Sequence, residues 1–283
     1  MSLVQRSFFS DVRALLAAAR KEWIIFRRYP SWVVAFVIWP LLGPLVFIFA
    51  AKAMSGPDGA GLATFEALSG TTDYVSYVIL GTTIWTWLNF TLWDVGFSLR
   101  NEQMRGTLES NWLCPVWRLS LMLGASLTKL LTSMFFLAVT VIETWLAFGI
   151  WLLQGNVALI LLFLVLVMPS IYGIGLAFAS LVIRFREANT MVFFVRGIFM
   201  IFCGMTYPLE VMPGWMQKAA AWLPLTYAVR GIRSAALAGA TWSDCAPDLL
   251  RLAAFSVVLP LLGYAAFHFV ERRSRRTGVL GQY

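Results

Sequence analysis

Residues Val157–Ile183 read VALILLFLVLVMPSIYGIGLAFASLVI and contain no charged side chain. A helix needs about 20 consecutive apolar residues to cross the hydrocarbon core of a bilayer, and this stretch exceeds that length. The rest of the chain has the same character: 60% of residues are hydrophobic and 13% are charged, against about 25% charged in a soluble domain. The sequence therefore predicts an all-α, polytopic membrane protein.

Five further apolar stretches flank this one and complete a pattern of six predicted transmembrane helices. In chain order the spans are 32–51, 74–93, 130–153, 157–183, 190–207 and 253–270. A polar loop over 94–129 separates the second span from the third, and a longer segment over 208–252 precedes the last. We find no internal repeat or second domain, so residues 1–283 are expected to form a single transmembrane domain.

Residues 1–30 are predicted to form an amphipathic helix. Four arginines recur every seven residues beside an apolar face made of Phe8, Val12, Leu15, Ala19, Trp23 and Phe26. This pattern is typical of a helix that lies in the headgroup region of a membrane. The alternative is a cytosolic helix that packs on the protein's own loops. The charges in this segment also break any apolar signal-peptide core, so we expect no signal peptide.

The distribution of lysine and arginine orients the chain. With the N-terminus inside, sixteen of these residues lie on the cytoplasmic side and five on the other. Basic residues near span ends favour the cytoplasm, so both termini and the loop 94–129 are predicted to be cytoplasmic. The segment 208–252 is then external. It holds two short helix candidates, Trp215–Leu223 and Thr226–Leu237, too short to cross and too apolar for water, which indicates re-entrant helices.

Catalytic, metal and nucleic-acid functions find little support. The three cysteines, Cys114, Cys203 and Cys245, lack metal-ligand spacing, and His268 is the single histidine. No phosphate-binding Gly-rich loop is present, so this chain is not expected to bind ATP or another cofactor itself. Its basic residues lie beside the spans and do not gather on one soluble face, which argues against a nucleic-acid-binding function. A membrane-embedded lipid-modifying enzyme and an ATP-independent channel remain alternatives from other classes.

Two charged residues fall inside predicted spans. Glu143 and Arg196 each cost about 2.5–3.5 kcal/mol at the bilayer centre on insertion scales, so partners or water are expected around them. They are candidates for the transport pathway or for a mutual ion pair. Arg196 has a second interpretation, because a long side chain near a span end reaches the headgroups.

Two motifs carry a family resemblance. Asn101-Glu102-Gln103-Met104-Arg105-Gly106-Thr107-Leu108-Glu109, followed by Pro115-Val116-Trp117-Arg118, resembles the cytoplasmic loop of ABC-2 type transporter permeases, although Cys114 stands where that family usually has Thr or Ser. The external segment resembles the family's second hallmark, the re-entrant region before the last span, at Pro208, Glu210, Pro213, Gly214, Trp215 and Pro224.

The resemblance implies the transmembrane subunit of an ATP-driven exporter in the plasma (inner) membrane. Such a subunit pairs with a second permease copy, as a homodimer or with a paralogue, and docks two copies of a separate cytoplasmic ATPase that holds ATP and Mg. The contact residues implied for the ATPase are Asn101, Glu102, Arg105, Gly106, Thr107, Leu108 and Glu109, with Arg184, Phe185, Arg186 and Glu187 as a second contact.

The cargo is less well defined by the sequence. Apolar spans with sparse charge favour an amphipathic, drug-like or lipid-linked substrate that moves between the paired subunits. Export of a polysaccharide or lipo-oligosaccharide by the same kind of permease is the second interpretation. Membrane lipids are expected around the chain in either case.

Overall fold

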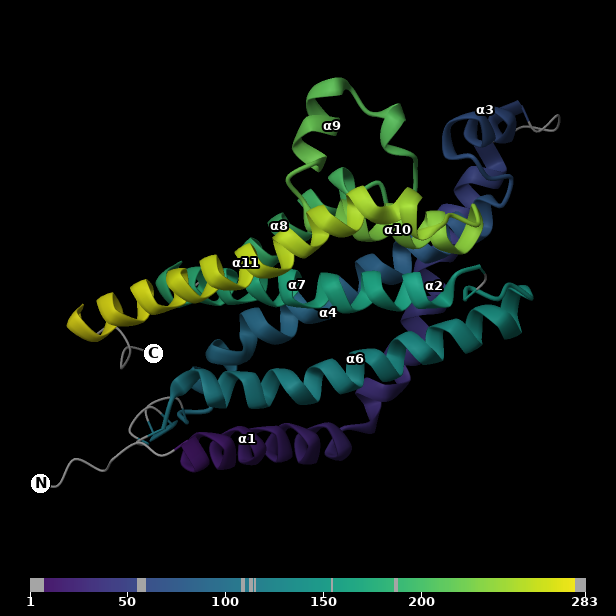
Figure 1. Cartoon of the computed structure of the whole chain (residues 1–283). Helices are drawn as coiled ribbons and strands as arrows, with labels where there is room; N and C mark the ends of the chain where they lie inside the picture. Colours follow the sequence, from purple (N-terminus) through teal and green to yellow (C-terminus); the bar gives the residue numbers. More distant parts are fainter. Residues whose placement is uncertain are drawn as a thin grey trace, which may run out of the picture.

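Every regular element that the computed structural model describes is a helix, which confirms the all-α class (Figure 1). The structure describes residues 8–54, 60–107, 110–111, 114, 116–153, 155–185 and 188–277. The helices are α1 (Phe8–Arg28), α2 (Pro30–Met54), α3 (Ala60–Ser69), α4 (Tyr74–Met104), α6 (Arg118–Phe148), α7 (Val157–Phe185), α8 (Ala188–Phe202), η1 (Leu209–Val211), α9 (Gly214–Ala220), α10 (Pro224–Leu237) and α11 (Trp242–Thr277).

Four of these helices are long and apolar enough to cross a membrane. Their candidate spans are Val33–Ala50 in α2, Leu123–Phe148 in α6, Val157–Ser180 in α7 and Trp242–Val270 in α11. The chain is therefore a multi-pass membrane protein. The helices at the spans predicted over 74–93 and 190–207 are not among these four: α4 is long enough but less apolar, and α8 has only 15 residues. Helix α4 carries hydroxyl and amide side chains, and α8 contributes only the shorter apolar stretch Phe193–Phe202.

Several helices extend beyond the predicted spans. Helix α4 continues through the polar residues up to Met104, because Arg, Glu, Gln and Met are good helix formers once outside an apolar environment. Helix α6 begins at Arg118 and ends at Phe148, where Gly149 adopts a left-handed conformation with φ of 69°. Helix α11 runs through Pro247 and Pro260 as one element. The loop expected over 94–129 is thus helical at both of its ends.

Helices α7 and α11 form the most extensive packing in the molecule (Figure 1). Two glycines set their separation: a Cβ atom on Gly173 would lie 2.3 Å from the carbonyl carbon of Leu259, and one on Gly263 would lie 2.2 Å from the carbonyl oxygen of Gly173. Small residues at such contacts allow two backbones to approach closely within a membrane. Helix α10 packs against α7, α11 and α4, and nearly all of its residues are buried.

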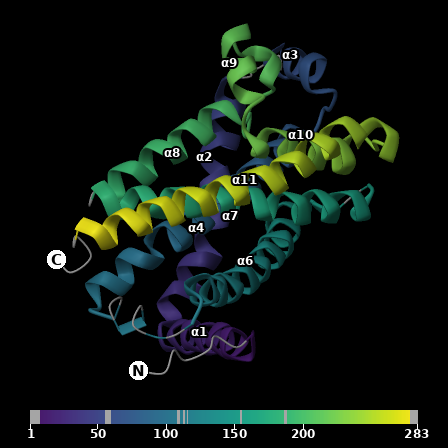
Figure 2. The ribbon, with the colours of Figure 1, turned by 60° about the vertical axis from the view of Figure 1, so that its left-hand side comes forward.

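Helix α1 runs alongside the first half of α6. The Thr128 hydroxyl donates to the carbonyl oxygen of Ala19 at 2.8 Å, and the rings of Phe26 and Phe136 meet edge to face. After Tyr29, α2 turns away and crosses the long helices at a steep angle in both ribbon views (Figures 1 and 2). The predicted amphipathic helix therefore packs one side on a neighbouring helix of the same chain.

Candidate functional site

Glu102 joins the end of α4 to helix α1. Its carboxylate accepts hydrogen bonds from the Lys21 ammonium group and from the Thr107 hydroxyl, and from the Asn111 side-chain amide at 2.8 Å. Lys21 and Glu102 also form an ion pair, although they lie far apart in the sequence. One carboxylate thus connects an N-terminal helix, the last turn of α4 and the residues that follow it.

The sequence around Gly106 explains why α4 ends here. Gly106 has a φ of 67°, and the Thr107 N–H donates to the Glu102 carbonyl oxygen at 3.0 Å. A left-handed glycine followed by this long-range backbone bond is the Schellman ending of a helix. The adjacent Thr107 is then placed so that its hydroxyl reaches the Glu102 side chain. The predicted contact residues Asn101, Glu102, Arg105, Gly106 and Thr107 therefore lie in the last turn of α4 and directly after it.

The surroundings of Glu102 keep its side chain ionised. Burial alone would raise the pKa of this carboxyl, but the hydrogen bonds from Lys21 and Thr107 and the charges of Lys21 and Arg105 outweigh it. The pKa is lowered as a result. An ionised carboxylate that accepts three side-chain donors is a fixed point between α1 and α4.

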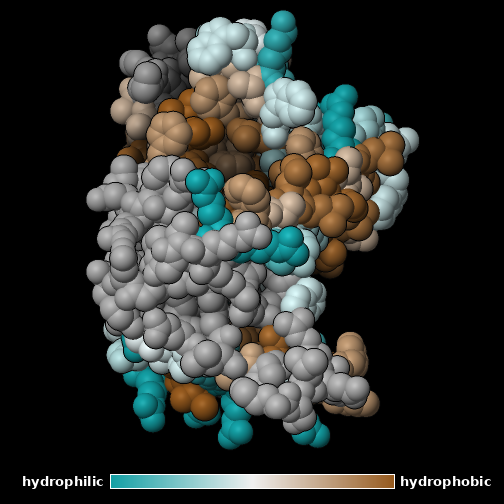
Figure 3. Space-filling view, turned by 90° about the vertical axis from the view of Figure 1, so that its left-hand side faces the viewer, coloured by the Kyte–Doolittle hydropathy of each residue, from teal (hydrophilic) through white to brown (hydrophobic). Residues whose placement is uncertain are grey.

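Helix α1 has a second attachment at the start of α6. The Trp117 N–H donates to a carboxylate oxygen of Asp11 at 2.7 Å. Helix α1 therefore contacts both sides of the polar segment Arg100–Arg118. Figure 3 views this end of the molecule, where hydrophilic side chains project from the lower edge along which α1 lies. Sequence reasoning missed the roles of Asp11 and Lys21, because their partners are distant in sequence.

The ion pair between Lys21 and Glu102 should respond to acid. Since the pKa of Glu102 is depressed, the stability that the pair contributes is present above the ordinary glutamate pKa of about 4.3 and is lost as the pH falls through the lower folded value. We expect a double-mutant cycle of Lys21→Gln and Glu102→Gln to show a coupling of about 0.2–1 kcal/mol near neutral pH. That coupling should be weaker at an acid pH, below the ordinary glutamate pKa.

Thermal unfolding of the four detergent-solubilised proteins at the two pH values measures this coupling. The same cycle on Arg230 and Asp248, another ion pair of a partly exposed base with a more buried acid, serves as the reference. A Lys21–Glu102 coupling that is undiminished in acid, or that is absent near neutral pH, would contradict the assignment.

The other predicted contact residues are less fully described. Arg184 and Phe185 form the last turn of α7. Leu108, Glu109, Arg186 and Glu187 lie outside the described residues. Their expected role in contacting a partner therefore stays a prediction.

The two charged residues predicted to lie within spans, Glu143 and Arg196, do not contact each other. Both carboxylate oxygens of Glu143, on α6, are buried and receive no hydrogen bond from the described residues. The Arg196 guanidinium lies over the rings of Trp85 and Phe193, with 5.5 and 5.4 Å to the ring centroids. No ion pair joins Glu143 to Arg196 in the described part of the chain. Aromatic faces thus take the place of a carboxylate beside Arg196.

The motif predicted to be external lies at the starts of three short helices. Pro208 precedes η1, Pro213 precedes α9, and Pro224 opens α10. Glu210, Gly214 and Trp215 are exposed. Across the α9–α10 junction, the Thr226 hydroxyl donates to the Ala220 carbonyl and the Tyr227 hydroxyl to the Ala221 carbonyl, both at 2.8 Å.

Arg233, on α10, carries a buried charge, and its burial was not predicted from the sequence. Its guanidinium donates to the carbonyl oxygens of Tyr77 at 2.8 Å and Gly204 at 2.6 Å, and also to that of Met205. Its Cζ atom lies over the Tyr77 ring, 3.4 Å from the ring centroid. One side chain thus ties α10 to α4 and to the turn after α8. The available signal was its spacing of three residues from Arg230, which places the two arginines on neighbouring faces of one helix.

Comparison with known proteins agrees with the two motifs. The model of the ABC-2 type transporter family matches residues 13–237. The chain belongs to this family. It is 28% identical over 235 residues to the probable doxorubicin resistance ABC transporter permease protein DrrC of Mycobacterium tuberculosis, in both strain CDC 1551 / Oshkosh and strain ATCC 25618 / H37Rv. The match covers 81% of this chain and 81% of each relative. Membership of this family makes the chain a permease subunit of an ABC transporter, and the family in general implies a partner ATPase subunit.

Proposed function

We propose that this chain is the transmembrane subunit of an ATP-driven exporter, and that a separate ATPase drives it through the polar segment Arg100–Arg118. The observation that carries the proposal is the cluster around Glu102, where α4 ends and α1 is attached. A polar turn that is held from two sides transmits a displacement, whereas a loose loop absorbs it.

Helix α4 provides a direct mechanical connection. It is one element of 31 residues, which corresponds to a length of about 45 Å. Arg233 holds it near one end at Tyr77, and Lys21 holds it near the other at Glu102. Movement of the polar segment by an ATPase would therefore shift the helix against the turn after α8 and against α10.

The proposed assembly has two copies of the ATPase, which carry ATP and Mg, and a second permease copy or paralogue. All six predicted spans cross the plasma membrane, with α4 and α8 completing the set. Both termini are cytoplasmic in this proposal; the first turn of α1 and the last turn of α11 lie at the same end of the molecule, which supports it (Figure 1). Helices α9 and α10 then form the external re-entrant region.

The proposed cargo is amphipathic and drug-like or lipid-linked. A cavity of about 20 Å³ lies among α2, α4 and α6, with hydroxyl groups of Thr83, Thr86 and Ser133 in its lining. A drug-sized ligand needs about 300–1,000 Å³, so this cavity holds no more than a water molecule. A route between paired subunits fits the exposed apolar faces better. The relatives' association with doxorubicin resistance supports a drug-like cargo.

Replacing residues 102–109 by a Gly/Ser linker of equal length tests the proposal. We expect the linker variant to insert in the membrane and to lose substrate-stimulated ATP hydrolysis by the partner subunit, because the turn around Glu102 is removed. Hydrolysis is measured in the reconstituted complex. Lys218→Gln, an exposed position on α9, is the control and should couple normally. Full stimulation in the linker variant would refute the assigned role of the polar segment.

A further inference from the structure

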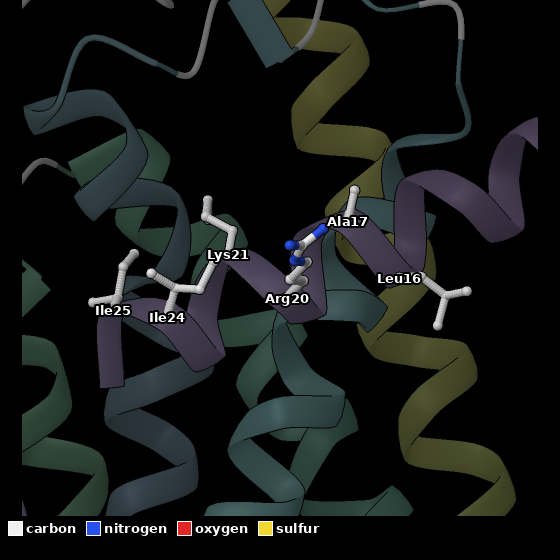
Figure 4. A pocket seen from close by; sticks show the side chains of 6 residues that line it. All are labelled: Leu16, Ala17, Arg20, Lys21, Ile24 and Ile25. Atoms are coloured by element: carbon white, nitrogen blue, oxygen red, sulfur yellow. The ribbon is translucent and has the colours of Figure 1, made fainter. Parts of the chain in front are cut away.

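The side of α1 that faces away from α6 carries two basic side chains set among apolar ones. They line an open hollow of about 560 Å³ (Figure 4). Residues four apart in a helix lie above one another on one face. The lining residues therefore form two rows along the helix. One row is Leu16, Arg20 and Ile24, and the other is Ala17, Lys21 and Ile25. In each row the basic residue stands between two apolar ones.

The apolar surface of α1 is only partly used in packing on α6. Ala18 is buried there, and a Cβ atom on Gly124 of α6 would lie 2.9 Å from the Ala18 methyl group. Leu16 and Ile24, in contrast, are 58% and 44% exposed. Helix α6 therefore covers only part of the apolar surface of α1. The uncovered part, with Leu16 and Ile24, borders the hollow.

Of the two basic side chains in the hollow, only Lys21 has acidic partners among the described residues. Lys21 contacts Glu102 and lies 3.3 Å from Glu22. Arg20 is exposed, and no described acidic residue pairs with it. No acidic side chain lines the hollow. A complementary occupant would have a negative centre and apolar arms on either side of it.

We propose that this hollow binds an anionic phospholipid of the surrounding bilayer. The lipid phosphate lies against Arg20 and Lys21, and the two acyl chains contact Leu16 on one side and Ile24 on the other. A soluble phosphate would leave these apolar flanks without a partner, whereas an anionic leaflet supplies both chemistries and attracts basic segments beside it. The inference goes beyond the exporter proposal, because it needs only the membrane and this chain.

The site has a consequence for the polar segment. Lys21 is shared: its ammonium group holds Glu102 and also lines the hollow. A lipid phosphate beside Arg20 competes with Glu102 for that cation. The charge of the surrounding lipid therefore adjusts how firmly α1 is attached to the end of α4.

Lipid binding can be measured with the full-length chain in phosphatidylcholine nanodiscs that contain increasing amounts of phosphatidylglycerol with brominated acyl chains. Bromine quenches tryptophan, and Trp23, 46% exposed and beside Ile24, is the reporter. A Trp23→Phe variant gives the background from the other tryptophans. We expect Arg20→Gln to raise the phosphatidylglycerol fraction needed for half-quenching about fivefold, the factor for one basic residue at an anionic surface.

Arg28→Gln is the matched control. It removes the same charge from an exposed position on the same helix, two turns from Arg20 and outside the lining of the hollow, and should leave the half-quenching fraction unchanged. Equal shifts of the half-quenching fraction in both variants, or no shift in Arg20→Gln, would overturn the proposal. Equal quenching by brominated phosphatidylcholine would also overturn it. Relief of quenching by soluble glycerol phosphate would instead identify a free-phosphate site and refute the lipid assignment.

Discussion

Replacing Arg233 by methionine is expected to reduce the free energy of unfolding by about 3 kcal/mol. The guanidinium donates to three backbone carbonyl groups, those of Tyr77, Gly204 and Met205. Methionine has similar length and no donor, so these buried oxygens lose a partner at about 1–3 kcal/mol each, offset by the desolvation that the charge no longer suffers. For a chain of this size, the apparent Tm should fall by about 5–10 °C.

Gly81, on α4, lies in close contact with the Arg233 guanidinium and with the turn after α8. A Cβ atom on Gly81 would lie 2.0 Å from the Met205 carbonyl oxygen and 2.1 Å from a terminal nitrogen of Arg233. The glycine is what allows α4, the turn after α8 and the guanidinium to meet. Lysine at position 233 should recover only part of the loss, because a single ammonium group does not reproduce the planar fork of arginine.

Arg230→Met provides the control for this prediction. Arg230 lies one turn earlier on α10 and is exposed. Its Nε–H donates to a carboxylate oxygen of Asp248, with 2.7 Å between nitrogen and oxygen. An exposed ion pair contributes about 0–1 kcal/mol, so its loss should hardly change the Tm. Thermal unfolding of the detergent-solubilised variants is monitored by tryptophan fluorescence. The Tm values distinguish the loss of Arg230 from the loss of Arg233. Similar Tm values for Arg230→Met and Arg233→Met would show that Arg233 is not a buried tie.

The contrast between these two arginines shows where sequence reasoning stops. Composition and hydropathy predict the membrane class and the start of α7 at Val157, because a charge-free stretch of that length has few other stable environments. The spacing of Arg230 and Arg233 places them on neighbouring faces of a helix. It does not say which face is buried, since that depends on α4 and on the turn after α8.

The polar segment shows the same limit. Its motif indicates a contact surface, and Gly106 indicates the end of a helix. The ion pair between Lys21 and Glu102 depends on the packing of α1 along α6, which no local pattern encodes. The span predicted over 74–93 is shorter than α4 for a related reason. Hydropathy ends a predicted span where polar residues begin, while helix propensity continues through them.

Gly173→Ala and Gly263→Ala should each lower the free energy of unfolding by about 1–3 kcal/mol, the usual cost of overpacking. The added methyl group would meet backbone rather than a flexible side chain: at Gly173, the Leu259 carbonyl carbon at 2.3 Å and the Pro260 nitrogen at 2.4 Å. Helices α7 and α11 would have to separate to admit it. Because these two helices share the most extensive packing in the molecule, the separation also removes contacts along their length.

Gly197→Ala supplies a control with the opposite sign. Gly197 lies in α8, and a Cβ atom there would meet nothing within 4 Å. In open space the substitution should be neutral or stabilising by up to about 1 kcal/mol, because alanine is the better helix former.

The double variant Gly173→Ala/Gly263→Ala should lose less free energy of unfolding than the sum of the losses in the two single variants. A Cβ at Gly263 would lie 2.2 Å from the Gly173 carbonyl oxygen, so once one methyl group has separated the helices the second needs less movement. Additive losses in thermal unfolding, or a loss at Gly197 equal to that at Gly173, would show that helix propensity rather than the close approach of α7 and α11 governs these positions.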